Sequence, residues 1–476
     1  MPNIRTVAPE ELEKQREIMA ELAEENAALP AAPLALVDTY GCQQNEADSE
    51  RIRGMLREMG WNFTDREEEA DLIILNTCAV RGHAELRVLG NVGALSHTKR
   101  LKPDQRIALC GCMVQQPHMR EKLKASYPYV DLVFGTHELW RLPELLKKLY
   151  APHRGRIYEA RDIDGERVED LPVLRTPGVR AWLPIMYGCN NFCSYCIVPY
   201  VRGRERSRDA RAVIREARDL IAAGYKEIYL LGQNVNSYGR DLGGETDFSD
   251  LLRELNGLEG DFVLRFMTSH PKDASEKLFQ TMAECRKVER HIHLPFQAGA
   301  DRVLKAMNRG YTAEGYRRKV EYARSLMPDI AVTSDVIVGF PGETEAEFAD
   351  TLALVGDIRF DMLFTFLYSP RVGTPAAAMP DPFGKEEKQA RFDRLLALQE
   401  GISRETQAAH VGNAYRILVD GRGDKPGRLT ARSIHNRLIH LEGPESLIGT
   451  FREARITSST TWSLWAEPKN GAWENG

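Results

Sequence analysis

The run Tyr187-Gly-Cys-Asn-Asn-Phe-Cys-Ser-Tyr-Cys196 follows an apolar stretch and places Cys189, Cys193 and Cys196 on one short loop. Cubane iron–sulfur clusters are normally held by four thiolates, so three on one loop leave one iron without a protein ligand. An open iron can chelate a small molecule. A structural zinc site is the alternative, but zinc usually takes four ligands in two pairs, and no second pair of Cys or His follows at a suitable distance. The spacing therefore favours a [4Fe-4S] cluster.

A second set of three cysteines lies nearer the N-terminus. Cys42, Cys78 and Cys112 each follow a short apolar run, and the runs cover residues 34–38, 71–75 and 106–109. Each run precedes a small-residue turn and a helical stretch, which is the rhythm of a parallel βαβ sheet. Ligands of open α/β sheets gather beyond the carboxyl ends of the strands. The three thiols are therefore predicted to converge, and three turn cysteines with no common ligand is the alternative.

The two remaining cysteines have no such company. Cys110 lies inside an apolar strand end and Cys285 on a predicted helix. Both are predicted to be structural, since a free cysteine packs as a small hydrophobic residue.

Composition describes an ordinary globular chain. Its 476 residues are 43% hydrophobic and 28% charged, which suggests two to four domains. No apolar run is long enough to span a membrane and no signal-peptide core is present, so we expect a cytoplasmic protein whose grouped cysteines serve metal or catalysis. The net charge of −5 hides an asymmetry of −4 over residues 1–30 and +3 over residues 411–470. The latter suits a polyanion.

Three further regions follow from the pattern of apolar runs. A polar helix is predicted over residues 10–28, packed on a neighbouring domain. A second α/β series has predicted strands at 182–187, 227–231, 263–268, 291–295, 331–338 and 363–367, and helices at 208–223, 273–287, 301–307, 312–326 and 343–358. Six units suit an open, partial barrel. A charged helix at 384–408 then leads to short strands over 412–468, predicted to form a small all-β barrel.

The chain resembles the radical S-adenosylmethionine (SAM) methylthiotransferases, specifically the MiaB family of tRNA-modifying enzymes, from about residue 34 to 467. The run 187–196 is similar to the radical-SAM motif, in which Tyr195 is the usual aromatic. The other motifs are Thr39-Tyr-Gly-Cys-Gln-Gln-Asn45, Asn76-Thr-Cys-Ala-Val-Arg81, Gly111-Cys-Met-Val-Gln115, Leu231-Gly-Gln-Asn-Val-Asn-Ser-Tyr238, Thr268-Ser-His-Pro271, His293-Leu-Pro-Phe-Gln297, Asn308-Arg-Gly-Tyr-Thr312, Thr333-Ser-Asp-Val-Ile-Val-Gly-Phe-Pro-Gly-Glu-Thr344 and Tyr368-Ser-Pro-Arg371. Departures from the family pattern are Gln44, Met267, Ala298, Ala300 and the run Ser463-Leu-Trp-Ala-Glu467.

The resemblance implies an α/β multidomain fold. Its parts would be an N-terminal helical extension (1–32), an open α/β methylthiotransferase domain (33–150), a linker (151–174), a partial (β/α)6 radical-SAM barrel (175–405) and a C-terminal all-β TRAM domain (408–471), which binds RNA. Two [4Fe-4S] clusters and SAM are the implied cofactors. Cys189, Cys193 and Cys196 would hold the cluster that cleaves SAM, and Cys42, Cys78 and Cys112 the auxiliary cluster that holds sulfur.

The implied reaction adds sulfur and then methyl to carbon 2 of an isopentenylated adenosine beside the tRNA anticodon. That aromatic carbon–hydrogen bond is not acidic, so a 5′-deoxyadenosyl radical takes the place of a general base. SAM would lie over the strand ends of the barrel. Its expected contacts are Tyr195, Gln233, Asn234, Gln297, Gly339, Glu343, Ser369 and Arg371, with His270 and His293 as further pocket residues or structural histidines.

Basic residues suggest where RNA binds. The arginines after the cluster loop form either a solvated helix face or phosphate contacts: Arg202, Arg204, Arg206, Arg208, Arg211 and Arg215. In the last domain, the expected contacts with the anticodon stem-loop are Arg416, Arg428, Arg432, Asn436 and Arg437. We expect a monomer that draws on a separate electron donor and sulfur donor, with no membrane attachment.

Two alternatives stay open at this point. A sister methylthiotransferase would act on threonylcarbamoyl-adenosine in tRNA or on an aspartate of a ribosomal protein, although Tyr-Gly-Cys-Gln and Leu-Gly-Gln-Asn-Val-Asn match the isopentenyl type better. A non-catalytic iron–sulfur RNA-binding or redox-sensing protein would carry two clusters without cleaving SAM.

Overall fold

The computed structural model describes residues 4–79, 82–152, 155–161, 164–243, 246–471 and 473, and for residues 82–84 the backbone alone. The chain divides into two compact units. The first consists of residues 1–176, 186–190 and 196–208, and the second of residues 177–185, 191–195 and 209–476. Every described helix is too short or too polar to cross a membrane.

The first unit is built on a parallel sheet of six strands in the order β2-β1-β3-β4-β5-β6. The strands are β1 (Leu34–Thr39), β2 (Asn62–Phe63), β3 (Leu72–Thr77), β4 (Arg106–Gly111), β5 (Leu132–Phe134) and β6 (Ile157–Glu159). The helices are α1 (Pro9–Ala27), α2 (Gln43–Glu58), α3 (Gly82–Leu101), α4 (Cys112–Gln115), α5 (Pro117–Ser126), α6 (Leu142–Tyr150) and α7 (Val198–Arg202). The parallel βαβ arrangement predicted from the first three apolar runs is confirmed.

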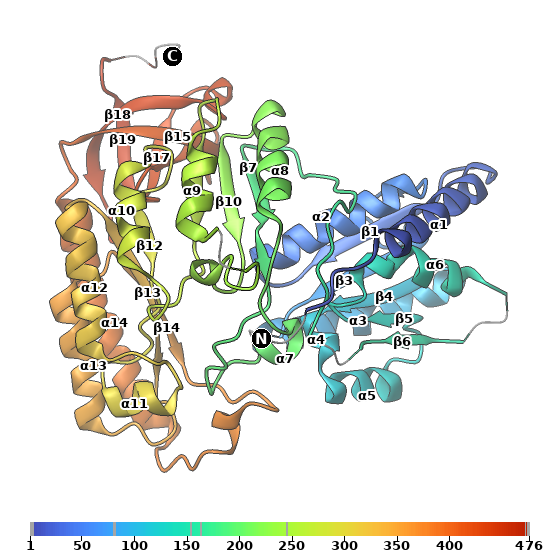
Figure 1. The fold of residues 1–476 in the computed structure, drawn as a ribbon, viewed down its shortest axis with the longest axis horizontal. Coiled ribbons are helices and arrows are strands. Elements are labelled where there is room, and N and C mark those ends of the chain that lie inside the picture. The colour runs from blue at the N-terminus through green and yellow to red at the C-terminus, as the bar shows by residue number, and fades with distance from the viewer. Residues whose placement is uncertain are drawn as a thin grey trace. The chain divides into compact units, whose positions relative to one another are not determined.

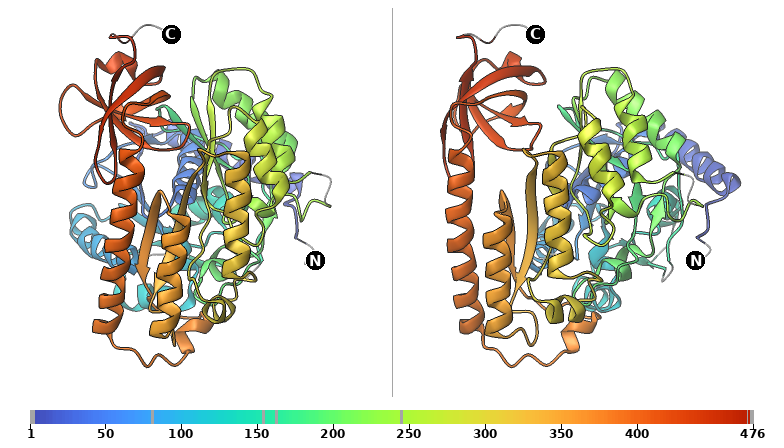
Figure 2. Two further views of the ribbon diagram at one scale, coloured as in Figure 1. Left: turned by 90° about the vertical axis from the view of Figure 1, so that its left-hand side faces the viewer. Right: turned by 60° about the vertical axis from the view of Figure 1, so that its left-hand side comes forward.

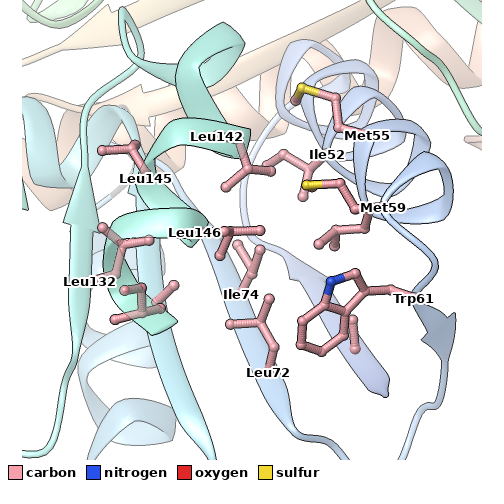
Figure 3. Close-up of a cluster of buried hydrophobic side chains, with 14 of the residues drawn as sticks. Ile52, Met55, Met59, Trp61, Leu72, Ile74, Leu132, Leu142, Leu145 and Leu146 are labelled. Carbon is pink, nitrogen blue, oxygen red and sulfur yellow. The ribbon is translucent and has the colours of Figure 1, made fainter. Parts of the chain in front are cut away.

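Both faces of this sheet are buried around β3, because its run Leu72–Leu75 is apolar and its side chains point alternately to the two sides. Leu72 and Ile74 point into one core with side chains of α2 and α6, as Figure 3 shows, whereas Ile73 and Leu75 point into a second core on the other face. Each fully buried side chain of this kind contributes about 1.5–3 kcal/mol. The two cores fix the strands, and with them the positions of the three strand ends.

The edges of the sheet differ from the sequence-based expectation. Strand β6 pairs with β5 and lies within residues 151–174, which were predicted to be a linker. Residues 153–154 and 162–163 of that linker, and residues 1–3 of the N-terminal extension, lie outside the described residues. Helix α1 packs on α6 and α2, as predicted for a helix lying on a neighbouring domain, and its Asn26 side chain donates a 2.7 Å hydrogen bond to the carbonyl of Met59.

The second unit begins with six parallel strands in two groups, β11-β10-β7 and β12-β13-β14. Their bounds are β7 (Arg180–Pro184), β10 (Glu227–Leu231), β11 (Val263–Phe266), β12 (His291–His293), β13 (Ala331–Val338) and β14 (Met362–Leu367). The helices are α8 (Ala210–Ala222), α9 (Phe248–Asn256), α10 (Glu276–Glu284), α11 (Asp301–Ala306), α12 (Ala313–Leu326), α13 (Glu345–Ile358) and α14 (Lys385–Ala408). In Figure 1, α12, α13 and α14 run beside β12–β14. The predicted six-unit parallel arrangement is confirmed.

Local chemistry explains where the predicted elements were wrong. The predicted strand 182–187 is divided, because β7 ends at Pro184, which has no N–H for the ladder. Residues Met186–Tyr187 (β8) instead pair antiparallel with Arg206–Ser207 (β9) in the first unit. Helix α13 begins two residues later than predicted, since Thr344 caps it by accepting the N–H of Glu347. Helix α9 was not predicted.

A closed five-stranded barrel completes the second unit, as predicted. Its strands are β15 (Ala414–Arg422), β16 (Arg428–Ser433), β17 (Leu438–Glu442), β18 (Phe451–Ser459) and β19 (Leu464–Pro468). Figure 2 shows the long helix α14 leading directly to it. Buried arginines join this barrel to the parallel strands. Arg265 of β11 donates a 3.0 Å hydrogen bond to the carbonyl of Ser433, and Arg437 pairs with Asp361.

Candidate iron–sulfur and S-adenosylmethionine sites

The first unit brings Cys42, Cys78 and Cys112 to the carboxyl ends of β1, β3 and β4. Cys42 immediately precedes α2, Cys78 follows β3, and Cys112 opens α4. Gly41 shows how closely they converge, because a Cβ at this position would lie 2.6 Å from Cβ of Cys78 and 3.1 Å from its Sγ. Gly41 also has a φ of +134°, which favours glycine. The backbone thus brings the turn before Cys42 against Cys78, at neighbouring strand ends. Within the described part of the chain no three His, Cys, Asp or Glu side chains are grouped for a single metal ion, so a cluster shared by all three thiols stays a prediction.

These thiols are buried or half-buried, and a charged side chain lies beside one of them. Cys78 and Cys112 are 2% and 3% exposed, and Cys42 is half-buried. Burial raises the pKa of the Cys112 thiol to about 12, against the opposing charge of Arg202. A thiol with such a pKa keeps its proton at neutral pH until a metal displaces it. Donor type and burial therefore fit an iron–sulfur cluster that these residues would hold.

Two further residues complete this site, and sequence reasoning did not assign them to it. The Arg202 guanidinium is 5% exposed, and it donates from Nε to Sγ of Cys112 at 3.1 Å, from Nη1 to Asp48 at 2.7 Å and from Nη2 to Asn45 at 2.8 Å. The Cys42 thiol donates to Oδ1 of the same Asn45 at 3.5 Å. Asn45 ends the quoted motif Thr39–Asn45, which was the available signal for it. Arg202 thus links two of the cysteines through one buried hydrogen-bond network.

Sequence reasoning misread the basic run that contains Arg202. Arg202, Arg206 and Arg208 are all buried, so none of the three forms a solvated helix face or a phosphate contact. Arg206 donates to backbone carbonyls of residues 164, 202 and 204, and Arg208 pairs with Glu169. Arg211 and Arg215 of α8 are exposed, as a solvated face requires.

The second cysteine set lies on residues 189–196, along which the chain changes from one unit to the other and back. Cys189 and Cys196 belong to the first unit and Cys193 to the second. Gly188 precedes the loop with a φ of +73°, and a Cβ there would lie 1.9 Å from the carbonyl oxygen of Arg204. Only glycine can therefore lead the chain into this loop. Among the described residues, no three His, Cys, Asp or Glu side chains are grouped for a single metal ion.

In the second unit, Cys193 is 7% exposed and contacts a buried arginine. Arg309 donates from Nη1 to Sγ of Cys193 at 3.2 Å and to the hydroxyl of Tyr195 at 3.3 Å, and from Nη2 to the carbonyl of Pro295 at 2.7 Å. Its Nε donates to the hydroxyl of Tyr311 at 3.0 Å. Arg309 belongs to the quoted motif Asn308–Thr312, but sequence reasoning gave it no role.

The ring of His270 also lies next to the Cys193 thiol. Its Nε2 is 3.9 Å from Sγ of Cys193, and its Nδ1 accepts the backbone N–H of Lys272 at 3.2 Å. Burial, with the nearby charges of Arg309 and Lys272, lowers the pKa of His270 to about 2. The ring is therefore neutral and lies next to Cys193. Whether it lines a SAM pocket or is a structural histidine stays a prediction.

A set of buried polar atoms marks the carboxyl ends of β10, β11 and β12. Within the described residues, hydrogen-bond partners are missing for Oε1 of Gln233, Oδ1 of Asn234, both amide atoms of Asn236, Oγ of Ser269 and Oε1 of Gln297. Leaving such atoms buried and unpaired costs about 1–3 kcal/mol each unless a ligand satisfies them. An amino-acid nucleoside such as SAM offers amino, carboxylate, hydroxyl and adenine groups, so these residues fit it. Asn236 and Ser269 were not on the predicted list.

The other predicted SAM contacts have different surroundings. Glu343 is 1% exposed, and its carboxylate accepts the N–H of Gly339 at 2.8 Å, so it shapes the turn after β13. Burial raises the pKa of Glu343 to about 7. Ser369 is exposed beyond β14, and the carbonyl of Arg371 accepts hydrogen bonds from Thr374. Tyr195 is half-buried against Arg309.

Three family models match consecutive parts of the chain. They are the uncharacterized protein family UPF0004 over residues 35–135, the radical SAM superfamily over 183–355 and the TRAM domain over 408–469. Among solved structures, the radical SAM methyltransferase TsrM from Kitasatospora setae matches with a TM-score of 0.55 at 16% identity, over 72% of this chain and 77% of that one. That likeness concerns the fold alone. Fold, cysteines and matched models together define a multidomain radical-SAM protein.

Two relatives that match nearly the whole chain show to which family of radical-SAM proteins it belongs. A protein of Acetivibrio thermocellus is 48% identical over 96% of this chain and 96% of its own length, and one of Alkaliphilus oremlandii is 49% identical over 97% and 98%. Both are named tRNA-2-methylthio-N(6)-dimethylallyladenosine synthase. The chain belongs to this family of radical-SAM methylthiotransferases, as its motifs predicted.

Proposed function

We propose that this chain is a radical-SAM methylthiotransferase that converts N6-isopentenyladenosine beside the tRNA anticodon (position 37) to its 2-methylthio derivative. The observation that carries the proposal is the pair of three-cysteine sets, each one thiolate short of a complete cluster ligand set. Relatives that share nearly the whole chain carry the name of this activity. The same relatives favour the isopentenyl substrate over threonylcarbamoyl-adenosine or a ribosomal-protein aspartate.

Each site residue has a separate part in the proposal. Cys42, Cys78 and Cys112 would hold an auxiliary [4Fe-4S] cluster, and Cys189, Cys193 and Cys196 the radical-SAM [4Fe-4S] cluster. When bound, the two clusters supply the electron that cleaves SAM and the site at which sulfur is held. The protein positions the reactants and excludes water. The buried amides of Gln233, Asn234 and Gln297, with Tyr195, would orient SAM, while Glu343 fixes the Gly339 turn and Ser369 and Arg371 lie beyond β14.

RNA recognition falls to the C-terminal barrel in this proposal. Arg416, Arg428 and Arg432 lie on its strands with half-buried or exposed side chains, and Trp462 is 52% exposed. Arg437 is buried against Asp361, so it fixes the barrel instead of meeting RNA. We place the functional boundaries at residues 1–32, 33–150, 151–174, 175–405 and 408–471. The enzyme would act in the cytoplasm as a monomer, with separate electron and sulfur donors.

Iron counting with cysteine variants tests the division of labour. Cys112→Ala and Cys193→Ala should each retain half of the wild-type iron after anaerobic reconstitution. Only Cys112→Ala should still convert SAM to 5′-deoxyadenosine. Cys285→Ala, which removes a buried cysteine outside both sets, is the matched control and should keep all the iron. Loss of SAM cleavage in both site variants, with the fold intact, would contradict the assignment.

Nucleoside mass analysis tests the substrate. A strain lacking this protein should accumulate N6-isopentenyladenosine in tRNA and lack its 2-methylthio derivative, and the intact gene should restore it. Unchanged 2-methylthio-isopentenyladenosine in the deletion strain would refute the proposed function. A redox-sensing protein would leave the nucleosides unaltered and give no 5′-deoxyadenosine.

A further inference from the structure

The inner face of β13 and β14 exposes two large aromatic side chains. Alternate residues of a strand point to opposite faces. Val336, Val338 and Leu363 face the layer that contains α14 and are at most 8% exposed. The opposite face carries Phe364 and Phe366, which are 37% and 44% exposed. Register pairs Phe364 with Asp335.

Exposed phenylalanines on an inner sheet face are unusual for a stable core. A phenylalanine buries about 150–250 Å² when it is covered, and leaving it in water forfeits that gain. Exposed apolar surface gathered at one place commonly marks a binding site. Phe364 and Phe366 are two residues apart on one strand, so their rings project from the same face and can act together.

Polar groups beside this aromatic pair are held in fixed positions. The His293 ring packs edge-on against Phe364, with ring centroids 5.7 Å apart and planes at 72°. Its Nε2 lies 3.3 Å from Oδ1 of Asp335, and its Nδ1 lies 3.0 Å from the hydroxyl of Thr333. The Asp335 side chain stays 29% exposed. A carboxylate oriented by His293 therefore stands next to two apolar rings.

We propose that Phe364, Phe366 and Asp335 bind the isopentenylated adenine of the RNA substrate. The proposal rests on the proposed function and names the part of the site that recognises the base. A flipped-out base offers a flat ring for stacking, an apolar five-carbon chain and a single remaining N6–H. The rings match the first two features and the Asp335 carboxylate accepts the N6–H. Unmodified adenosine lacks the apolar chain, so this surface distinguishes the two.

The adenine of SAM is the competing occupant. It would also stack on an aromatic ring, and Phe366 lies near the carboxyl end of β14, toward which SAM is expected. The two occupants differ in what they predict. Loss of an RNA-base surface weakens the preference for isopentenylated RNA and spares SAM cleavage, whereas loss of a SAM surface reduces cleavage in the absence of RNA.

The test compares binding of two anticodon stem-loops, with and without the isopentenyl group, to reconstituted full-length enzyme. Phe364→Ala and Phe366→Ala should each weaken binding of both RNAs through lost stacking, and should lower the preference for the isopentenylated RNA by about tenfold, the size of a lost apolar contact with the five-carbon chain. Asp335→Asn should weaken binding of both RNAs by a smaller factor than the phenylalanine variants do, because an amide oxygen still accepts the N6–H. Phe364→Leu keeps the apolar area and should fall between wild type and Phe364→Ala.

Leu396→Ala is the matched control, since Leu396 is 43% exposed on α14. It should change neither the RNA preference nor formation of 5′-deoxyadenosine. Full RNA preference in both phenylalanine variants, or impaired SAM cleavage without RNA, would overturn the assignment. A wild-type enzyme that modifies neither RNA would instead refute the proposed function, so the two failures are distinguishable.

Discussion

Arg265 offers the sharpest test of what holds the second unit together. Its side chain is fully buried on β11, and it bonds to Glu227 through Nε, to Glu289 through Nη1 at 3.2 Å and to the carbonyl of Ser433 through Nη2 at 3.0 Å. Both carboxylates are fully buried as well. Replacing the guanidinium by the apolar side chain in Arg265→Leu leaves two buried anions with fewer partners.

The magnitude follows from what each group keeps. Glu227 retains Arg180 at 2.6 Å, whereas the partners that Glu289 retains within the described residues are the N–H of Phe266 and the ring of His291. Removing one partner of a buried ion pair costs about 3–5 kcal/mol, and the surviving Arg180 contact places this case near 3 kcal/mol. The lost bond to Ser433, about 1 kcal/mol, also loosens the join between the parallel strands and the C-terminal barrel.

Amide hydrogen exchange of the full-length enzyme measures this loss of stability at individual strands. A loss of about 3 kcal/mol should speed exchange of the β11 and β16 amides by about a hundredfold. Arg404→Leu is the control, because Arg404 pairs with Glu400 on the surface, where both side chains are more than half exposed, and such pairs contribute about 0.3–0.5 kcal/mol. Equal exchange in the two variants would refute the reasoning.

The pH dependence of Arg265→Leu provides a second check. Burial opposes ionisation of Glu227, but Arg265 and Arg180 outweigh it and hold its pKa below the ordinary value of 4.5. The stabilisation by this carboxylate is therefore present above pH 4.5 and is lost as pH falls through the lowered folded-state pKa. Without Arg265 the folded-state pKa rises. The difference between variant and wild type should therefore be largest near neutral pH and shrink in acid.

Three further changes test other parts of the structure. Burial raises the pKa of Glu343 to about 7, so the native state binds a proton that the unfolded chain has already lost. The free energy of unfolding should therefore fall by about 3 kcal/mol as pH rises from 4.5 to 7. Glu343→Gln should flatten this pH dependence in thermal melts, and an unchanged slope would contradict the reasoning. Gly41→Ala places a Cβ 2.6 Å from Cβ of Cys78 and should remove half of the bound iron. Gly93→Ala is the control, because a Cβ there meets open space, and it should keep all the iron. Equal iron in both variants would show that the Gly41 turn does not lie against Cys78. Arg309→Met removes a cation whose Nη1 lies 3.2 Å from Sγ of Cys193. In an anaerobic EPR titration it should lower the reduction potential of the radical-SAM centre by on the order of 100 mV, and Arg309→Lys should give a potential between those of Arg309→Met and wild type. An unshifted potential would exclude the electrostatic role.

The sequence predicted those features that local pattern encodes. Strands β10 and β13 were predicted to the residue, because residues that favour strands predominate in each and a glycine, Gly232 or Gly339, follows its last residue. Strands β2, β5 and β6 have two or three residues each, too few for any periodicity to appear, so half of the first sheet was missed. The cysteine sets could be proposed from the sequence because residue type and spacing indicate the chemistry without any contact being known, and their role as cluster ligands stays a prediction.

Burial of individual charges was not readable in the same way. Arg202 stands among five other arginines, and nothing local distinguishes it from its exposed neighbours Arg211 and Arg215. Its partners Asn45, Asp48 and Cys112 lie at least 90 residues away along the chain. Such a contact is decided by the fold. The basic run therefore suggested phosphate binding where the folded chain uses its first member to bridge two strand-end loops.

The two buried arginines next to cysteines make the sites electrostatically unequal. Arg202 shares its charge with Asp48, so the guanidinium beside Cys112 is largely neutralised. The hydrogen bonds of Arg309 within the described residues go to a thiol, hydroxyls and a carbonyl, none of which carries a full negative charge. An uncompensated cation stabilises an added electron more than a compensated one at similar distance. An added electron is therefore stabilised more beside Cys193, which we propose to hold the SAM-cleaving cluster, than beside Cys112.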